Sequence, residues 1–247
     1  MRWKCTCAYD GTDYCGWQSQ PNRNTIQDAI ESQLLRVFKR PIRIYGGGRT
    51  DAGVHAHGQV FHFDADWNYG ADKLRLAINV CLEHAIRILK VELANPDFHA
   101  RYSACWKCYH YHFQFHPLNP FSVRYRWQIP QISIDRMQAI AQLLVGTHDF
   151  RGFGNKIMPE ENTIKTIRSA DIIQQDEHFI FSVIGSGYLY HMVRIMMGVL
   201  ATSSLHDPSM IKQLLKGQSS SIPIVPAPPQ GLFLEWIDYN TNQEEIC

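Results

Sequence analysis

The chain has 247 residues and a mass of 28.5 kDa, enough for one large domain or for two halves of about 120 residues each. Apolar residues make up 45% of it and charged residues 19%, which excludes an intrinsically disordered or a fibrous protein. The formal charge is only +1, so composition alone gives no argument for nucleic-acid binding, and any basic surface must be local.

The seven cysteines are odd in number and scattered, and the N-terminal segment has no apolar signal core. We therefore expect free thiols and a cytoplasmic protein. The most apolar stretch, residues 188–200, is interrupted by His191 and Arg194 and is too short to span a bilayer. We expect no membrane segment.

The first half of the chain predicts alternating strands and helices. A strand over residues 4–9 precedes a helix that Thr25 caps, with Asp28 three residues later, and that Pro41 ends. The further elements expected are a short strand over 42–45, a Gly-rich loop over 46–57, a strand over 59–65, a helix through Leu74 and Ile78, and a strand over 86–91.

The second half opens with strict alternation over residues 106–115, which predicts a half-exposed strand with Tyr109 and Tyr111 on one face and His110 and His112 on the other. The elements expected after it are a helix over 133–145, strands over 164–173 and 178–184, an apolar helix over 189–202, a short helix capped by Asp207, and a final strand over 232–239. Both halves therefore predict similar α+β units that divide near residues 101–105. Helices placed irregularly between strands favour an antiparallel sheet.

The Gly-rich segment over residues 46–55 places Arg49 and Asp51 two residues apart. A phosphate-binding loop is rejected, because this loop joins two strands and lacks the Gly-Lys-Ser/Thr sequence. Glycines permit unusual backbone angles and the close approach of a ligand. The alternative is a surface turn with a local ion pair, which is worth little.

Apolar residues cover almost the whole circumference of the helix over residues 189–200, which predicts a buried helix. Arg194 on this helix then needs a carboxylate or phosphate partner, because an unpaired buried guanidinium costs several kcal/mol. Asp51 is one candidate. The alternative is an arginine whose long stem reaches the surface.

Three further patterns indicate other functions. Cys105 and Cys108 have the spacing of a redox or zinc half-site, without a second such pair. Histidines two residues apart occur twice, as His55 with His57 and as His110 with His112, and each pair is a candidate for a metal hydrolase site. A sheet face that carries Tyr109 and Tyr111 is the alternative of a noncatalytic RNA-binding module.

Residues 46–64, GGGRTDAGVHAHGQVFHFD, closely resemble the signature of the tRNA pseudouridine synthase A (TruA) family. Other segments resemble further blocks of this family in the same order, so that nearly all of residues 1–239 is covered. They are AYDGTDYCGWQSQ, NTIQDAIE, FHARYSACWKCYHYHF, GTHDF, GYLYHMVRIMMG and PPQGLFLEWIDY.

The resemblance implies an enzyme that isomerises uridine to pseudouridine at positions 38, 39 and 40 in the anticodon stem-loop of tRNA. It also implies a homodimer, with no cofactor, no metal and no nucleotide cofactor. The implied fold is α+β, with two similar α/β-sandwich halves around a shared, mainly antiparallel sheet. Residues 1–104 would carry the catalytic loop, and residues 105–247 would complete the cleft.

Carried over by position, the resemblance makes Asp51 the catalytic carboxylate and Arg194 its partner. Arg49 would position the RNA or hold the place of the flipped base. Tyr109 would pack on the target uracil, and Leu232 would support the base from the other side. The loop reads GGGRTDAG where the family usually has GAGRTDAG, a difference of one methyl group.

Overall fold

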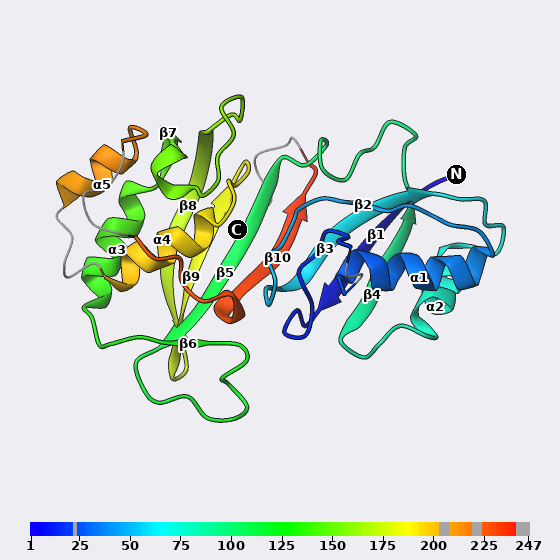
Figure 1. Ribbon diagram of the computed structural model, residues 1–247, viewed down its shortest axis with the longest axis horizontal. Coiled ribbons are helices and arrows are strands. Elements are labelled where there is room, and N and C mark those ends of the chain that lie inside the picture. Colours follow the sequence, from blue (N-terminus) through cyan, green and yellow to red (C-terminus); the bar gives the residue numbers. More distant parts are fainter. Residues whose placement is uncertain (22–23, 203–207, 219–223, 241–247) are drawn as a thin grey trace. The chain divides into compact units, whose positions relative to one another are not determined.

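The computed structural model describes residues 1–21, 24–202, 208–218 and 224–240 (Figure 1). The chain forms two compact units. Unit 1 comprises Met1–Cys105 and Phe233–Cys247, and unit 2 comprises Trp106–Leu232. In this grouping the chain from Phe233 onwards joins the first unit, where Phe233 and Leu234 pair with His55 and Ala56, whereas the sequence predicts a division into residues 1–104 and 105–247.

The sheet of unit 1 is built around β1 (Arg2–Tyr9), which pairs antiparallel with β3 (His55–Asp64) and with β4 (Ile86–Leu93). The short strand β2 (Tyr45–Gly46) pairs antiparallel with β3, and β10 (Leu232–Asp238) pairs parallel with it. Every second residue of β1 is buried, as expected for a strand with one face in a core.

Two helices accompany this sheet, α1 (Ile26–Phe38) and α2 (Ala71–Asn79). The side chain of Thr25 accepts the N–H of Asp28 and caps α1, as its sequence predicts. Three residues at helical spacing, Ile26, Ile30 and Leu34, are fully buried. Each stabilises the fold by about 1.5–3 kcal/mol relative to an exposed side chain.

The prediction of a strand over residues 42–45 is wrong. Of these four residues only Tyr45 lies in a strand, the two-residue β2 that it forms with Gly46. The backbone of Ile44 is bonded to side chains of α1 instead. Its N–H donates to Glu31 Oε1 at 3.0 Å, and its carbonyl accepts from Gln27 Nε2 at 3.2 Å. The side chains of Ile42 and Ile44 are nevertheless buried. The apolar pattern of this segment therefore indicated burial and not strand pairing.

The sheet of unit 2 is also mainly antiparallel. β5 (Trp106–Gln114) pairs with β9 (His178–Gly185), β9 with β8 (Ile164–Gln175), and β8 with β7 (Gly146–Asp149), all antiparallel. The two-residue strand β6 (Trp127–Gln128) pairs parallel with β5. Antiparallel pairs thus dominate both units, which confirms the α+β class.

The helices of unit 2 are α3 (Ile134–Leu143), α4 (Met192–Ala201) and α5 (Pro208–Leu214), with 3-10 turns at Phe150–Phe153 and Pro229–Gly231. The expected start of α4 at residue 189 is three residues early, because His191 has a left-handed φ of 64° that ends the helical geometry. Pro208 begins α5 as expected, while its expected cap, Asp207, lies outside the described residues.

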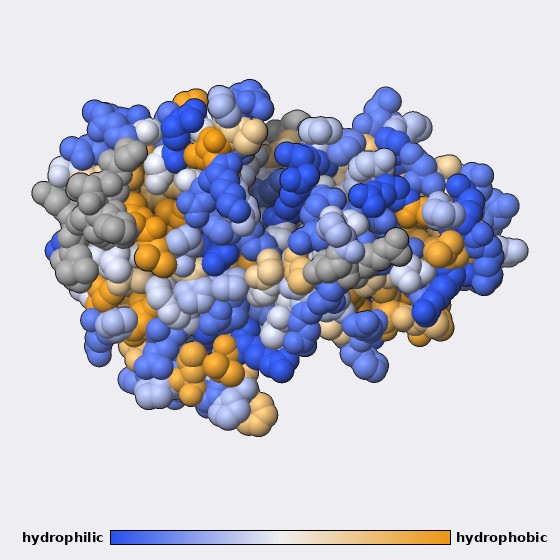
Figure 2. Space-filling model, in the orientation of Figure 1, coloured by the Kyte–Doolittle hydropathy of each residue, from blue (hydrophilic) through white to orange (hydrophobic). Residues whose placement is uncertain are grey.

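Polar residues cover most of the face drawn in Figure 2, and apolar residues form separate patches on it. One patch lies over the loop that follows β5, where Phe121 is 89% exposed. Within the described ranges, no helix is both long and apolar enough to cross a membrane. No disulfide joins the cysteines there either.

Candidate active site

Residues 47–54 join β2 to β3 and carry both Arg49 and Asp51. The loop connects two antiparallel strands, which confirms the rejection of a phosphate-binding loop. Arg49 is exposed and Asp51 is half-buried. The loop therefore presents a guanidinium and a carboxylate at its surface.

Buried side chains fix the loop before the aspartate. Gln59 Nε2 donates to the carbonyl of Gly48 at 2.7 Å, and Gln59 Oε1 accepts the N–H of Gly48 at 3.2 Å. The hydroxyls of Thr50 and Tyr9 lie 2.8 Å apart, and the carbonyl of Thr50 accepts the N–H of Trp17 at 3.1 Å. Tyr9, Trp17 and Gln59 are all buried, so they hold this backbone from the core side.

A tight turn follows at Asp51 itself. Its carbonyl accepts the N–H of Val54 at 3.1 Å, and Gly53 within the turn has φ 77°. The segment around Gly16, φ 87°, packs closely against the turn. A Cβ atom added at Gly16 would lie 2.6 Å from the oxygen of Thr50 and 3.0 Å from the carbonyl carbon of Asp51. The position of the carboxylate thus depends on backbone packed within unit 1.

Gly46 and Gly47, the first glycines of the Gly-rich segment, pack closely against other residues of unit 1. A Cβ atom at Gly46 would collide with the indole of Trp17, and one at Gly47 would lie 2.9 Å from the hydroxyl of Tyr239. Neither residue has a positive φ. The expectation that these glycines admit a ligand is therefore wrong for Gly46 and Gly47, whose space is filled by neighbouring side chains.

The residues that hold the loop were not predicted. The sequence contains one signal for them: Gln59 is a polar residue directly before the apolar pair Val60 and Phe61, and its side chain is fully buried. A buried amide needs hydrogen-bond partners, and here they are the two backbone groups of Gly48. Tyr9 and Trp17 carry no comparable signal, because aromatic residues are common in any core.

The histidines considered for a metal site have other contacts in unit 1. His55 is buried, and its Nδ1 accepts the N–H of Gly11 and lies 3.1 Å from Asp10 Oδ1. His57 Nδ1 lies 3.0 Å from Glu235 Oε2, and this hydrogen bond raises the pKa of His57. The two imidazoles therefore bind different carboxylates.

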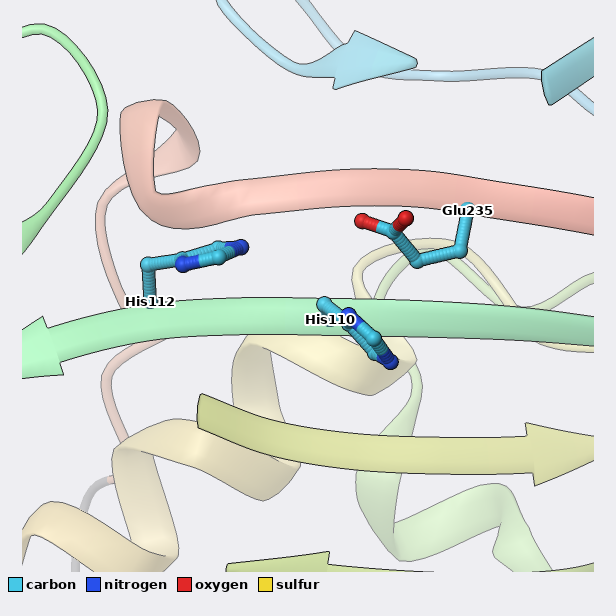
Figure 3. Close-up of side chains that lie close together, drawn as sticks. All are labelled: His110, His112 and Glu235. Carbon is cyan, nitrogen blue, oxygen red and sulfur yellow. The ribbon is translucent and has the colours of Figure 1, made fainter. Parts of the chain in front are cut away.

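The second histidine pair, His110 and His112, lies on β5 of unit 2, with ring centroids 6.3 Å apart (Figure 3). Glu235, drawn with them, lies on β10 and belongs to unit 1, where it binds His57. Among the described residues, neither unit by itself brings three histidine, cysteine or carboxylate side chains into a metal-binding cluster.

The tyrosine face of β5 is buried, whereas His110 and His112 on the opposite face are half-buried, in agreement with the expected alternation. Tyr109 is 6% exposed and packs edge-on against Tyr188, with ring centroids 5.0 Å apart. Tyr111 is fully buried, and its hydroxyl donates to the carbonyl of Pro228 at 2.7 Å. An RNA-binding module that stacks bases on an open Tyr109 and Tyr111 face is not supported.

Arg194 is the only half-buried residue of α4, whose other nine residues are buried. This confirms the predicted buried helix. Arg194 Nε donates to the carbonyl of Ala227 at 2.7 Å, and the N–H of Ala227 donates to the carbonyl of Arg194 at 2.9 Å. Burial raises the pKa of Tyr111, and the positive charge of Arg194 opposes this shift. The guanidinium is thus anchored at a fixed place in unit 2.

The candidate residues are distributed over the two units. Unit 1 holds Arg49 and Asp51, while unit 2 holds Tyr109, Arg194 and Leu232. Leu232 is the first residue of β10 and is 5% exposed. Each unit thus offers part of the predicted catalytic set.

Comparisons with known proteins match this chain over nearly its whole length. The family model described as tRNA pseudouridine synthase matches residues 6–103 and 140–240. The tRNA pseudouridine synthase A of Exiguobacterium sp. is 38% identical over 248 residues, which cover 99% of each chain. That of Exiguobacterium sibiricum is 40% identical over 249 residues, again 99% of each chain.

A third bacterium has a similar protein. The tRNA pseudouridine synthase A of Akkermansia muciniphila is 40% identical over 252 residues, 96% of this chain and 95% of its own. A crystal structure of a Cbf5-Nop10-Gar1 complex aligns at 7% identity with a TM-score of 0.39, covering 80% of this chain and 44% of that one, too little to bear on the fold. On the family match and these relatives, the chain belongs to the tRNA pseudouridine synthase family.

Proposed function

We propose that this chain isomerises uridine to pseudouridine at positions 38, 39 and 40 in the anticodon stem-loop of tRNA, with Asp51 as the catalytic carboxylate. The observation that carries the proposal is its membership of the tRNA pseudouridine synthase family over nearly the full chain. The segment around Asp51 lies inside the matched region. We further propose that the enzyme acts as a homodimer in the cytoplasm.

The chemistry requires little beyond one well-placed carboxylate. The bond between the sugar C1′ and N1 of uracil breaks, the base turns, and a bond forms between C1′ and C5. C5 then loses its proton to solvent, and N1, which has lost its bond to C1′, takes up a proton. The product is therefore an isomer of the substrate, and atoms and charge balance without a redox partner. Attack of Asp51 on C1′ and removal of a sugar proton by Asp51 are two routes for the first step, and both need an ionised carboxylate held in place.

The packing around the loop supports this role for Asp51. A carboxylate that must meet one atom of an extruded nucleotide gains from a backbone that does not move. Gln59 of β3 holds the loop through its hydrogen bond to the carbonyl of Gly48. The hydroxyl of Thr50 holds it through its hydrogen bond with Tyr9 of β1. We propose that Arg49, which is exposed on the same loop, contacts phosphate or the position that the flipped base leaves.

The residues of unit 2 are assigned by their positions in the family motifs. We propose that Tyr109 packs on the target uracil and that Leu232 supports it, which replaces the stacking that the base loses on extrusion. Arg194 is proposed as the partner that keeps Asp51 ionised. The Nε of its guanidinium already donates a hydrogen bond to the carbonyl of Ala227, so the charge is held in one place.

The test maps pseudouridine at single-nucleotide resolution in unmodified tRNA transcripts after incubation with the purified protein. We expect product at uridines 38, 39 or 40 with the wild type and none with Asp51→Asn. A transcript with cytidine at these three positions serves as the control and should gain no pseudouridine. Product elsewhere in the tRNA would reject the proposed positions, and product with Asp51→Asn would reject the catalytic role.

A second experiment tests Arg194 against a matched exposed arginine, Arg36, in the last turn of α1. Arg194→Met should reduce both activity and the melting temperature more than Arg36→Met, because it removes a half-buried charge and its hydrogen bond to Ala227. Equal activity and equal melting temperature for the two variants would contradict the role of Arg194. Size-exclusion chromatography with light scattering tests the homodimer.

A further inference from the structure

Four aromatic rings form a continuous row on unit 1, outside the loop of Asp51. Tyr45 stacks on His62 with ring centroids 5.2 Å apart, His62 lies 4.7 Å from His99, and His99 lies 4.4 Å from Tyr102. We call these four residues the aromatic row. Its ends are open to solvent, since Tyr45 is 51% and Tyr102 is 77% exposed.

The two histidines of the row are oriented by backbone hydrogen bonds. His62 Nδ1 accepts the N–H of Ala100 at 3.1 Å, and His99 Nδ1 accepts the N–H of Arg101 at 3.1 Å. A ring nitrogen that accepts a backbone N–H is unprotonated. Burial lowers the pKa of His62 to about 4 and also lowers that of His99. At neutral pH the row is therefore uncharged, with Tyr45 stacked on His62 and His62 edge-on to His99.

The backbone beneath the row is tied to the sheet. Arg2 on β1 forms two hydrogen bonds with the carboxylate of Asp64, at 2.9 and 2.7 Å, and a third with the carbonyl of Phe98 at 3.0 Å. The ammonium of Lys4 lies 5.5 Å from the centroid of the Phe98 ring. The segment that carries His99 and Tyr102 is thus held on β1, so the row is preorganised.

A positive charge accompanies the exposed end of the row. Arg101 is exposed, and its guanidinium carbon lies 5.8 Å from the centroid of the Tyr102 ring. Single-stranded nucleic acids bind where a cation meets the phosphate and an aromatic face stacks the base. The two open tyrosine rings offer faces on which a base can stack, and the arginine beside Tyr102 offers the charge that a phosphate needs.

We propose that Tyr45, Tyr102 and Arg101 bind unpaired nucleotides of the RNA substrate, the tyrosines by stacking and the arginine through phosphate. The inference rests on the proposed function and adds a substrate-binding surface to it. It assigns these residues no role in the reaction at the uracil. Its consequence is that the enzyme holds its RNA at a second place in unit 1, besides the loop of Asp51.

Binding of unmodified tRNA and of a labelled single-stranded oligouridine tests the proposal. Tyr45→Ala and Tyr102→Ala should each weaken binding by roughly 5-fold to 100-fold, the range expected for the loss of one base stack. Tyr102→Phe should restore it, since the ring is kept. Arg101→Gln should lower the slope of log K against log salt by about 0.7, the value for one phosphate contact on a single strand. The alanine variants should leave this slope unchanged.

Tyr69→Ala is the matched control. Tyr69 is also an exposed tyrosine of unit 1, 68% exposed, but its ring packs edge-on against Trp67 and is not part of the aromatic row. Its variant should bind RNA as the wild type does. Melting curves identify any variant that fails to fold, and Tyr102→Ala then carries the test because Tyr102 is the more exposed end of the row.

Wild-type binding by both Tyr45→Ala and Tyr102→Ala would overturn the inference, as would an equal loss with Tyr69→Ala. The binding assay is independent of turnover. A wild-type enzyme that forms no pseudouridine would reject the proposed function, whereas pseudouridine formation together with unaffected binding by the tyrosine variants would reject only the aromatic row.

Discussion

Replacing Gly16 with alanine should inactivate the enzyme, although Gly16 itself is not proposed to meet the substrate. Gly16 is buried and has φ 87°, a conformation that costs an L-residue about 1–3 kcal/mol. The new Cβ would also lie 2.6 Å from the oxygen of Thr50 and 3.0 Å from the carbonyl carbon of Asp51. Both neighbours are backbone, so relief requires the loop itself to move.

Gly70→Ala is the control. It introduces similar backbone strain but no collision, so it separates the effect of strain from the effect of moving the loop. Its φ is 84°, close to that of Gly16, but an added Cβ would have no heavy atom within 4 Å. Gly70→Ala should therefore lose only the conformational energy, about 1–3 kcal/mol, and keep its activity. Gly16→Ala should lose stability by more than this and should lose activity as well.

A shift of about 1 Å in a catalytic group lowers the rate by about 100-fold. We expect the single-turnover rate of pseudouridine formation with Gly16→Ala to fall by at least about 10-fold at a temperature where the variant is folded. Calorimetry gives the stability of both variants. Wild-type activity of Gly16→Ala, or an equal loss with Gly70→Ala, would refute the claim that this packing positions Asp51.

Three further predictions concern groups around the loop and the aromatic row. Gln59→Leu leaves the N–H and the carbonyl of Gly48 without their side-chain partner. It should lower the free energy of unfolding, measured by urea denaturation, by about 1–3 kcal/mol. An unchanged free energy would mean that the Gln59 amide does not hold the loop. Because the pKa of His62 is lowered to about 4, the unfolded chain takes up this proton before the folded chain does. Stability should therefore be complete above about pH 6.5 and fall by roughly 2–3 kcal/mol as the pH drops towards 4, and His62→Gln should flatten this dependence, measured by thermal melts across that range. Glu235→Gln should lower the pKa of His57 towards its ordinary value of about 6.5, since the hydrogen bond to Glu235 is what raises it; an NMR titration with an unshifted His57 would contradict this contact.

The elements that follow from local chemistry were predictable from the sequence. α1 is one example, because Thr25 and Asp28 form its cap and Ile26, Ile30 and Leu34 form its buried stripe. The apolar circumference of α4 likewise indicated its burial. Cap hydrogen bonds and helical periodicity depend on residues a few positions apart, so they are visible in one sequence.

Features set by distant partners were not predictable in the same way. Residues 42–45 have the apolar pattern of a strand, yet Ile44 bonds its backbone to Gln27 and Glu31 on α1. The start of α4 was misplaced because nothing in the neighbouring apolar residues announces the left-handed backbone of His191. Both outcomes depend on tertiary contacts that override local preference.

The candidate site shows the same division. Arg49 and Asp51 were recognisable because two charges stand among glycines and match a family motif. The side chains that hold their loop, Tyr9 and Gln59, come from strands β1 and β3, and only the fold places them under Gly48 and Thr50. Motifs identify the groups that meet a substrate, whereas the groups that position them are ordinary core residues in the sequence.

The most direct test of the central claim is the single-turnover release of tritium from tRNA that carries 5-tritiated uridine. Formation of the bond between C1′ and C5 must release the label to solvent, so release reports the isomerisation itself. We predict release by the wild-type protein and none above background by Asp51→Asn, with both proteins binding the tRNA. Equal release by the two proteins, or none by the wild type, would contradict the account.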